Sequence, residues 1–173
     1  MKAFGLLGWS GSGKTTLVVE LLPELRRRGL TVSTIKHTHH NVDVDRPGKD
    51  SFRHREAGAT EVVLASSARW ALLHELGDEP EPDVDDLIAR MTPVDLLLIE
   101  GFKTYPHPKL EVFRPSVGKE MIGGADDSVV AIASDEPIDG APVPILELND
   151  IPAIANFIIG YCRLSAANEN GAA

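Results

Sequence analysis

Apolar residues near the start of the chain follow two different spacings. Residues 2–7 form a short apolar run that stops at Gly8, as in a buried strand. Between residues 14 and 28, apolar side chains recur three and four positions apart, at Leu17, Val18, Leu21, Leu22 and Leu25. This spacing predicts a helix that ends at Gly29, and the β-branched residues 31–35 predict a second strand.

The middle of the chain is more polar and is divided into shorter elements. Residues 37–50 contain Pro47-Gly48 and are expected to form a loop, followed by a short helix from Ser51 to Gly58. Two apolar stretches separated by Ser66-Ser67 predict a β-hairpin. The expected bounds are residues 60–65 and 69–73 for its strands, and 83–91 for a further helix with an acidic first turn.

The remaining apolar runs complete an alternation of strands and helices. Residues 94–99 form an apolar run that only Asp95 interrupts, and such a run is typical of a strand buried on both faces of a parallel sheet. Residues 129–133 and 145–148 predict two more strands, and residues 152–161 predict a helix. The alternation predicts an α/β fold of the P-loop NTPase type, a mainly parallel sheet flanked by helices, with a β-hairpin extension. We expect a single nucleotide-binding domain over residues 1–164 and a disordered tail at residues 165–173.

The charge balance narrows the range of partners. The chain has 17 Lys and Arg against 26 Asp and Glu, and the resulting net charge of −9 repels the phosphate backbone of nucleic acids. No apolar run is long enough to cross a bilayer, and the single cysteine, Cys162, cannot form an intrachain disulfide. We therefore expect a cytoplasmic protein that binds neither nucleic acid nor membrane.

Residues 8–15 match the phosphate-loop pattern G-x-x-x-x-G-K-[ST], placed between a predicted strand and a predicted helix. Glycines let main-chain N–H groups turn toward phosphate oxygens, and the helix N-terminus adds a partial positive charge. Lys14 would reach the β and γ phosphates, and the Thr15 hydroxyl would ligate Mg²⁺. The predicted nucleotide-binding residues are Gly8, Ser10, Gly11, Ser12, Gly13, Lys14, Thr15 and Thr16.

An acidic residue at the end of a buried strand is the best partner for that metal ion. Ligands of parallel sheets lie beyond the carboxyl ends of the strands, where Glu100 closes the run at residues 96–99. Asp95 opens the same run, so we assign Glu100 and not Asp95 to the coordination sphere of Mg²⁺ or its water shell. Asp45 or Asp43 could also reach the ion, and the sequence does not choose between them.

The loop after the second strand carries a cluster of histidines and charged residues. Imidazoles suit transition metals, carboxylates suit Mg²⁺, and the local excess of Lys and Arg suits an anion. The loop could therefore bind a metal, position water, contact an anionic second substrate or partner, or be a solvated loop. The residues predicted for a second substrate or partner are His37, His39, His40, Lys49 and Asp50, together with Lys103.

Asp135 follows the predicted strand at residues 129–133, at a strand end that lies near the base in many GTP-binding folds. A carboxylate there can accept from N1–H and from the exocyclic amine of guanine, whereas adenine offers no such pair of donors. Asp135 is thus a candidate for selecting GTP, and a plain surface turn is the alternative.

Five segments together resemble the MobB family of molybdopterin-guanine dinucleotide biosynthesis adapter proteins. They are residues 8–16, 36–40 (Lys-His-Thr-His-His), 48–51 (Gly-Lys-Asp-Ser), 57–59 (Ala-Gly-Ala) and 100–103 (Glu-Gly-Phe-Lys). The resemblance covers roughly residues 2–112 and implies a GTP-binding homodimer with weak GTPase activity. It also implies that the protein assists a MobA-type guanylyltransferase in converting molybdopterin to its guanine dinucleotide, and the phosphate of molybdopterin would suit the basic loop.

The residues allow Lys14, Thr15, Glu100 and Mg²⁺ to hold GTP for attack by water. Turnover should be slow, because we identify neither a glutamine that positions water nor an arginine finger. One alternative is a small-molecule kinase whose acceptor binds in the loop at residues 37–50. Others are a metal-insertion GTPase that uses the histidines, and an adapter in which hydrolysis is incidental.

Overall fold

The computed structural model describes residues 1–38 and 42–165, and these form two units. Unit 1 combines Met1–His37 with the chain from Thr92 onward, and unit 2 is Thr38–Met91. The single domain predicted over residues 1–164 spans both units. His39, His40 and residues 166–173 of the predicted tail lie outside the described residues.

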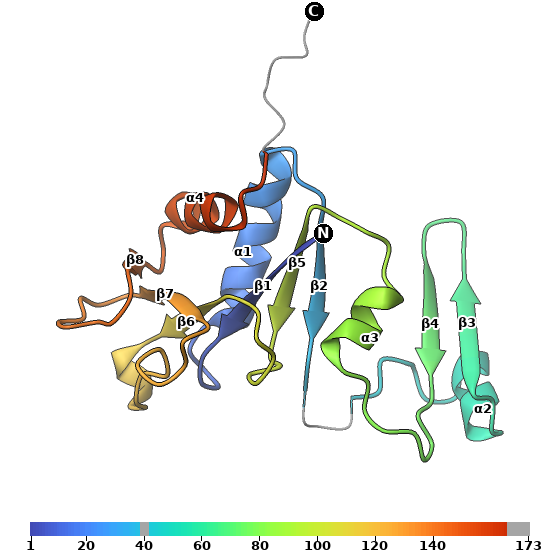
Figure 1. Cartoon of the computed structure of the whole chain (residues 1–173). Helices are drawn as coiled ribbons and strands as arrows, with labels where there is room; N and C mark the ends of the chain where they lie inside the picture. Colours follow the sequence, from blue (N-terminus) through green and yellow to red (C-terminus); the bar gives the residue numbers. More distant parts are fainter. Residues whose placement is uncertain (39–41, 166–173) are drawn as a thin grey trace, which may run out of the picture. The chain divides into compact units, whose positions relative to one another are not determined.

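Unit 1 is built on a six-stranded sheet with the order β2-β5-β1-β6-β7-β8 (Figure 1). All neighbouring strands are parallel. The strands are β1 (Lys2–Leu7), β2 (Val32–Lys36), β5 (Leu96–Glu100), β6 (Lys109–Phe113), β7 (Val129–Ser134) and β8 (Ile145–Glu147). After β1 the chain adds β2 and β5 on one side of it, then crosses to add β6, β7 and β8 on the other. The loop after β1 therefore lies where the strand order reverses, the place where open α/β sheets bind ligands.

Two helices, α1 (Lys14–Arg27) and α4 (Ile151–Cys162), pack on one face of this sheet (Figure 1). Alternate strand residues supply the sheet side of this core, because successive side chains of a strand point to opposite faces. The core includes Phe4, Leu6, Leu96 and Leu98 from the strands and Leu17, Leu21 and Leu25 from α1. These three α1 leucines lie on one stripe and are almost fully buried, at roughly 1.5–3 kcal/mol each.

Strand β6 is the one strand of the sheet that the hydrophobic pattern does not predict. Lys109 and Glu111 interrupt its apolar residues, yet they are only 2% and 0% exposed. The Lys109 ammonium donates to Tyr105 O at 2.8 Å and lies 3.8 Å from Asp126. The Glu111 carboxylate accepts from the main-chain N–H groups of Ile122 and Gly123. Charged side chains can be buried in a strand when each has such partners. The hydrophobic pattern therefore failed to predict β6.

Unit 2 contains an antiparallel hairpin and two short helices, as the sequence predicts. Its elements are α2 (Asp50–Glu56), β3 (Glu61–Ala65), β4 (Trp70–His74) and α3 (Val84–Ala89). Ser66 closes the hairpin turn, where its hydroxyl donates to Arg69 O at 3.0 Å. Helix α3 begins with a capping box, in which Asp83 and Asp86 each accept from the other's main-chain N–H.

The structure confirms the predicted fold class, a mainly parallel sheet flanked by helices with a separate β-hairpin. Gly29 follows α1 with a φ of 80°, the left-handed conformation expected where a helix ends. A short 3₁₀ helix, η1 (Pro115–Val117), follows β6. Among the helices of residues 1–38 and 42–165, none has the length and hydrophobicity needed to cross a membrane.

Candidate functional site

The phosphate loop joins the carboxyl end of β1 to the first turn of α1. Gly8 and Gly13 have φ values of 143° and 98°, which residues other than glycine rarely adopt. A Cβ on Gly8 would collide with Val112 O of β6 and lie 2.8 Å from Ser12 Oγ. The loop is therefore pressed against the sheet, and only glycine fits at its start.

The front of α1 is suited to an anion. Gly13 stands at the N-cap and provides no side-chain hydrogen bond to the first turn, and that turn carries no acidic residue. The first N–H groups of a helix lack partners within the helix, and they carry the positive end of its dipole. Ser12 Oγ is buried and has no hydrogen-bond partner among the described residues. A bound phosphate would satisfy such donors, so the loop fits the triphosphate predicted from its sequence.

Lys14 points back over this loop, where its ammonium donates to Trp9 O at 2.8 Å. Burial lowers the pKa of Lys14, the Glu100 carboxylate opposes that effect, and the ammonium groups of Lys103 and Lys36 lower the pKa further. Lys14 thus lies in a partly desolvated, predominantly cationic surrounding. A phosphate would stabilise its charged form more than water does.

Thr15 and Glu100 meet at the place where a metal ion is expected. Thr15 is the second residue of α1, Glu100 ends β5, and the Thr15 hydroxyl donates to Glu100 Oε1 at 3.1 Å. A hydroxyl and a carboxylate beside a phosphate site are the oxygen ligands that Mg²⁺ prefers. Asp95, which we set aside, lies at the other end of the strand and accepts from Thr31 N at 2.7 Å. The structure therefore brings together Thr15 and Glu100, two of the residues that the sequence predicts for Mg²⁺.

Lys36, to which the sequence gave no role of its own, ends β2 beside the same pair. Its ammonium lies 3.5 Å from Thr15 Oγ1 and 3.7 Å from Glu100 Oε2. One positive charge therefore already lies against both proposed metal ligands. Its position at the carboxyl end of a strand next to β5 is the signal that could have identified it.

Of the residues predicted for a second substrate or partner, His37 and Lys103 lie in unit 1. The main-chain N–H of His37 donates to Glu100 O at 2.8 Å, and its ring lies 4.4 Å from that of Phe102. Lys103 comes three residues after Glu100 and is exposed. Lys49 and Asp50 lie in unit 2, at the N-cap and the first residue of α2. No group of three histidine, cysteine or acidic side chains suited to a metal occurs among the described residues, which omit His39 and His40.

The two loop carboxylates that we considered for Mg²⁺ both face Arg55 within unit 2. Arg55 donates to both oxygens of Asp43 at 2.9 Å, and its Nε lies 3.5 Å from Asp45 Oδ2. Asp45 also accepts from the Ser51 hydroxyl at 2.9 Å. Each carboxylate therefore has a local structural partner, and binding of Mg²⁺ by Asp45 stays a prediction.

Asp135 is connected to the phosphate loop by Arg114, a residue to which the sequence analysis gave no role. Arg114 follows β6; its Nε donates to Ser12 O at 3.0 Å and its Nη1 to Asp135 Oδ2 at 2.5 Å. The other oxygen of Asp135 is buried and has no hydrogen-bond partner in the described part of the chain. Reading guanine with both oxygens would require Arg114 to release Oδ2, so the role of Asp135 stays a prediction.

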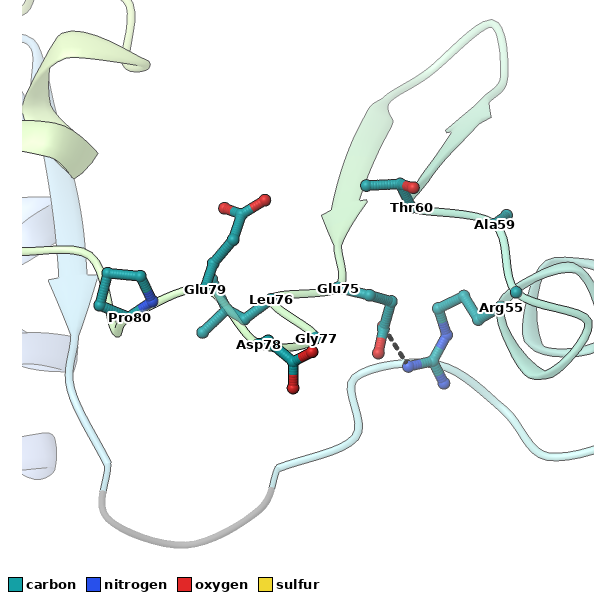
Figure 2. A pocket seen from close by; sticks show the side chains of 10 residues that line it. Arg55, Ala59, Thr60, Glu75, Leu76, Gly77, Asp78, Glu79 and Pro80 are labelled. Atoms are coloured by element: carbon teal, nitrogen blue, oxygen red, sulfur yellow. Dashed lines mark hydrogen bonds and ion pairs between the residues drawn. The ribbon is translucent and has the colours of Figure 1, made fainter.

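A surface pocket in unit 2 does not suit a nucleotide. It lies between the end of α2 and the turn that follows β4, and Figure 2 shows Glu75 facing Arg55 across it. Arg55 is the one cationic residue lining the pocket, and Glu75 already accepts from it at 2.8 Å. Asp78 and Glu79 line the same pocket, and their charges would repel phosphate groups.

Known proteins resemble this chain along most of its length. Residues 3–135 match the model of the MobB family, described as molybdopterin guanine dinucleotide synthesis protein B. The molybdopterin-guanine dinucleotide biosynthesis adapter protein of Escherichia coli K12 is 45% identical over 160 residues, which is 90% of each chain. The protein of the same name from Haemophilus influenzae is 45% identical over 157 residues, 89% of this chain and 85% of its own.

Solved structures agree with this match. A crystal structure of molybdopterin-guanine biosynthesis protein B has a TM-score of 0.72 and 28% identity, covering 93% of this chain and 99% of its own. Bacillus subtilis MobB has a TM-score of 0.75 at 24% identity, covering 95% of this chain and 100% of its own, and supports the fold alone. On the evidence of the family match and of these relatives, the chain belongs to the MobB family.

Proposed function

We propose that this chain is a Mg²⁺–GTP-binding adapter in molybdopterin guanine dinucleotide biosynthesis. The observation that carries the nucleotide part is the Thr15–Glu100 hydrogen bond of 3.1 Å beside the Lys14 ammonium and the front of α1. The adapter part is supported by the names of the Escherichia coli and Haemophilus influenzae relatives. We further propose that it acts in the cytoplasm as a homodimer, with a MobA-like guanylyltransferase as partner and molybdopterin as a possible ligand.

The residues of the site divide the work of holding a triphosphate. Main-chain N–H groups between Gly8 and Thr15 would surround the phosphate oxygens. The Lys14 ammonium would give up its hydrogen bond to Trp9 O and donate to a phosphate oxygen instead. Thr15 and Glu100 would hold Mg²⁺, directly or through water, and the ion would neutralise charge on the phosphates. Arg114 would keep the loop in shape through its hydrogen bond to Ser12 O.

Slow hydrolysis fits the same residues. The sequence contains no glutamine, so the side chain that positions water in many GTPases is missing from it. A partner or a second substrate that completed the site would raise the rate. GTP binding would then serve mainly to organise the interface with the guanylyltransferase.

Lys14→Ala is the test of the nucleotide site. The variant should lose roughly 10–100-fold or more in affinity for Mg²⁺–GTP, since charge-assisted hydrogen bonds contribute about 1.5–3 kcal/mol each. Isothermal titration with GTP in the presence of Mg²⁺ measures the change. Lys2→Ala, which removes an exposed lysine at the other end of β1, is the matched control and should bind as the unaltered protein does. Unchanged affinity in Lys14→Ala would refute the proposed site.

A further inference from the structure

Two lysine ammonium groups lie over the indole ring of Trp9, beside the phosphate loop. The Lys103 ammonium lies 5.1 Å from the centroid of the ring, and the Lys119 ammonium lies 5.9 Å from it. The ring is fixed because its Nε1–H donates to Glu120 O at 2.8 Å, while Trp9 O holds Lys14. Three ammonium groups thus gather around one residue in a chain with a net charge of −9.

The turn that carries Lys103 is fixed in a strained conformation. Gly101 has a φ of 102°, and Phe102 has a φ of 46°, which is rare for a residue with a bulky side chain. His37 holds this turn through its hydrogen bond to Glu100 O and through its ring contact with Phe102. A Cβ on Gly101 would lie only 2.7 Å from His37 Cβ. Strain of this kind persists where the surrounding structure enforces it, and it concentrates at functional sites.

The strained turn links Glu100, the proposed metal ligand, to the side chain of Lys103. Glu100 lies at the metal position, and Lys103 follows it by three residues on the same segment. The Lys103 ammonium is near enough to Lys14 to contribute to the lowered pKa of Lys14. Lysine has a flexible four-carbon stem, so its charge can move while the turn stays in place.

We propose that Lys103 is a cis-acting cation for the terminal phosphate of the bound triphosphate, and that the Trp9 ring holds its ammonium when no triphosphate is bound. This inference rests on the proposed nucleotide site. A cation over an aromatic ring is stabilised only modestly at an exposed position, whereas a pair with a phosphate is stronger, so the phosphate would draw Lys103 from the ring. Lys103 would then supply part of the charge neutralisation that an arginine finger gives in related enzymes.

A contact made only with the terminal phosphate has a distinctive signature in binding. Lys103→Ala should weaken Mg²⁺–GTP by roughly 10-fold or more and leave Mg²⁺–GDP unchanged, because GDP lacks that phosphate. Lys103→Arg should retain most of the preference for GTP. Lys119→Ala is the matched control, since it removes a cation from the same ring without touching the turn, and it should leave the GTP:GDP affinity ratio unchanged.

Trp9 itself provides a second measurement that does not depend on turnover. In a Trp70→Phe background, Trp9 is the remaining tryptophan. A non-hydrolysable GTP analogue should change its fluorescence as Lys103 leaves the ring, GDP should change it less, and the difference should vanish in Lys103→Ala.

Two results would overturn the inference. The first is a GTP:GDP affinity ratio in Lys103→Ala equal to that of the unaltered protein. The second is an equal loss of both nucleotides in a Lys103→Ala variant whose thermal unfolding is unchanged, which would indicate a general binding role. In either case loss of GTP in Lys14→Ala would leave the proposed function standing, so the two failures can be told apart.

Discussion

Acidification should destabilise unit 1 through one buried histidine, His107. The side chain is 4% exposed and packs where a Cβ on Gly5 would collide with its Nε2, and its ring centroid is 5.2 Å from that of Tyr105. The pKa of His107 is lowered from 6.5 to about 4, mainly because the ring is buried and secondly because the Lys109 ammonium lies nearby. The nearby Tyr105 main chain and the charge of Asp126 raise the pKa of His107 and oppose this effect only in part.

The size and direction of the effect follow from that pKa. Between pH 6.5 and about pH 4 the unfolded chain binds a proton that folded His107 does not, so the free energy of unfolding decreases as the pH falls through this window. The stabilisation is fully present above pH 6.5. At about 1.4 kcal/mol for each pH unit, its complete loss amounts to about 3.5 kcal/mol, and about 2 kcal/mol is lost by pH 5.

Urea unfolding at several pH values between 7 and 4.5, followed by circular dichroism, measures this loss. His107→Phe keeps an aromatic ring of similar size and cannot take up the proton, so its stability should fall by about 2 kcal/mol less between pH 7 and pH 5. His54→Phe, at an exposed position of α2, is the matched control and should keep the pH dependence of the unaltered protein. Parallel pH profiles for His107→Phe and the unaltered protein would refute the reasoning.

Two further substitutions examine the proposed nucleotide site. Glu100→Gln preserves shape but removes the charge beside Thr15, so Mg²⁺ should strengthen GTP binding roughly 10-fold less than in the unaltered protein. Titration of GTP at several Mg²⁺ concentrations measures this, and an unchanged Mg²⁺ dependence would exclude Glu100 from the metal site. Asp135→Asn can still accept from Arg114, yet it should reduce the preference for GTP over ATP if Asp135 reads the base. Competition between the two nucleotides measures that preference, and no change would remove Asp135 from the base site.

Local patterns in the sequence were sufficient for the phosphate loop and for the ends of most elements. The glycines of residues 8–13, Lys14 and Thr15 lie in one short segment between a strand and a helix, so a local motif is enough to predict the roles that we propose for them. Glu100 could also be predicted, because a continuous apolar run showed which strand was buried and which residue closed it. The parallel sheet then placed that residue beside Thr15.

Partnerships between distant residues could be seen only in the tertiary structure. Strand β6 escaped prediction because Lys109 and Glu111 look like surface residues until their buried partners are known. Arg114 connects Ser12 to Asp135 across two strand ends, a contact that no local spacing encodes.

For Lys103 too, the sequence pointed to the segment and only the tertiary structure showed its contact. The sequence marked the Glu-Gly-Phe-Lys segment at residues 100–103 as unusual, but its cation lies on Trp9 only because β5 and β1 are adjacent and parallel. Short-range hydrogen bonding and periodicity thus determined the local elements from the sequence alone. The pairing of charges was decided by sheet order and burial, because electrostatic partners are selected by distance in space and not along the chain.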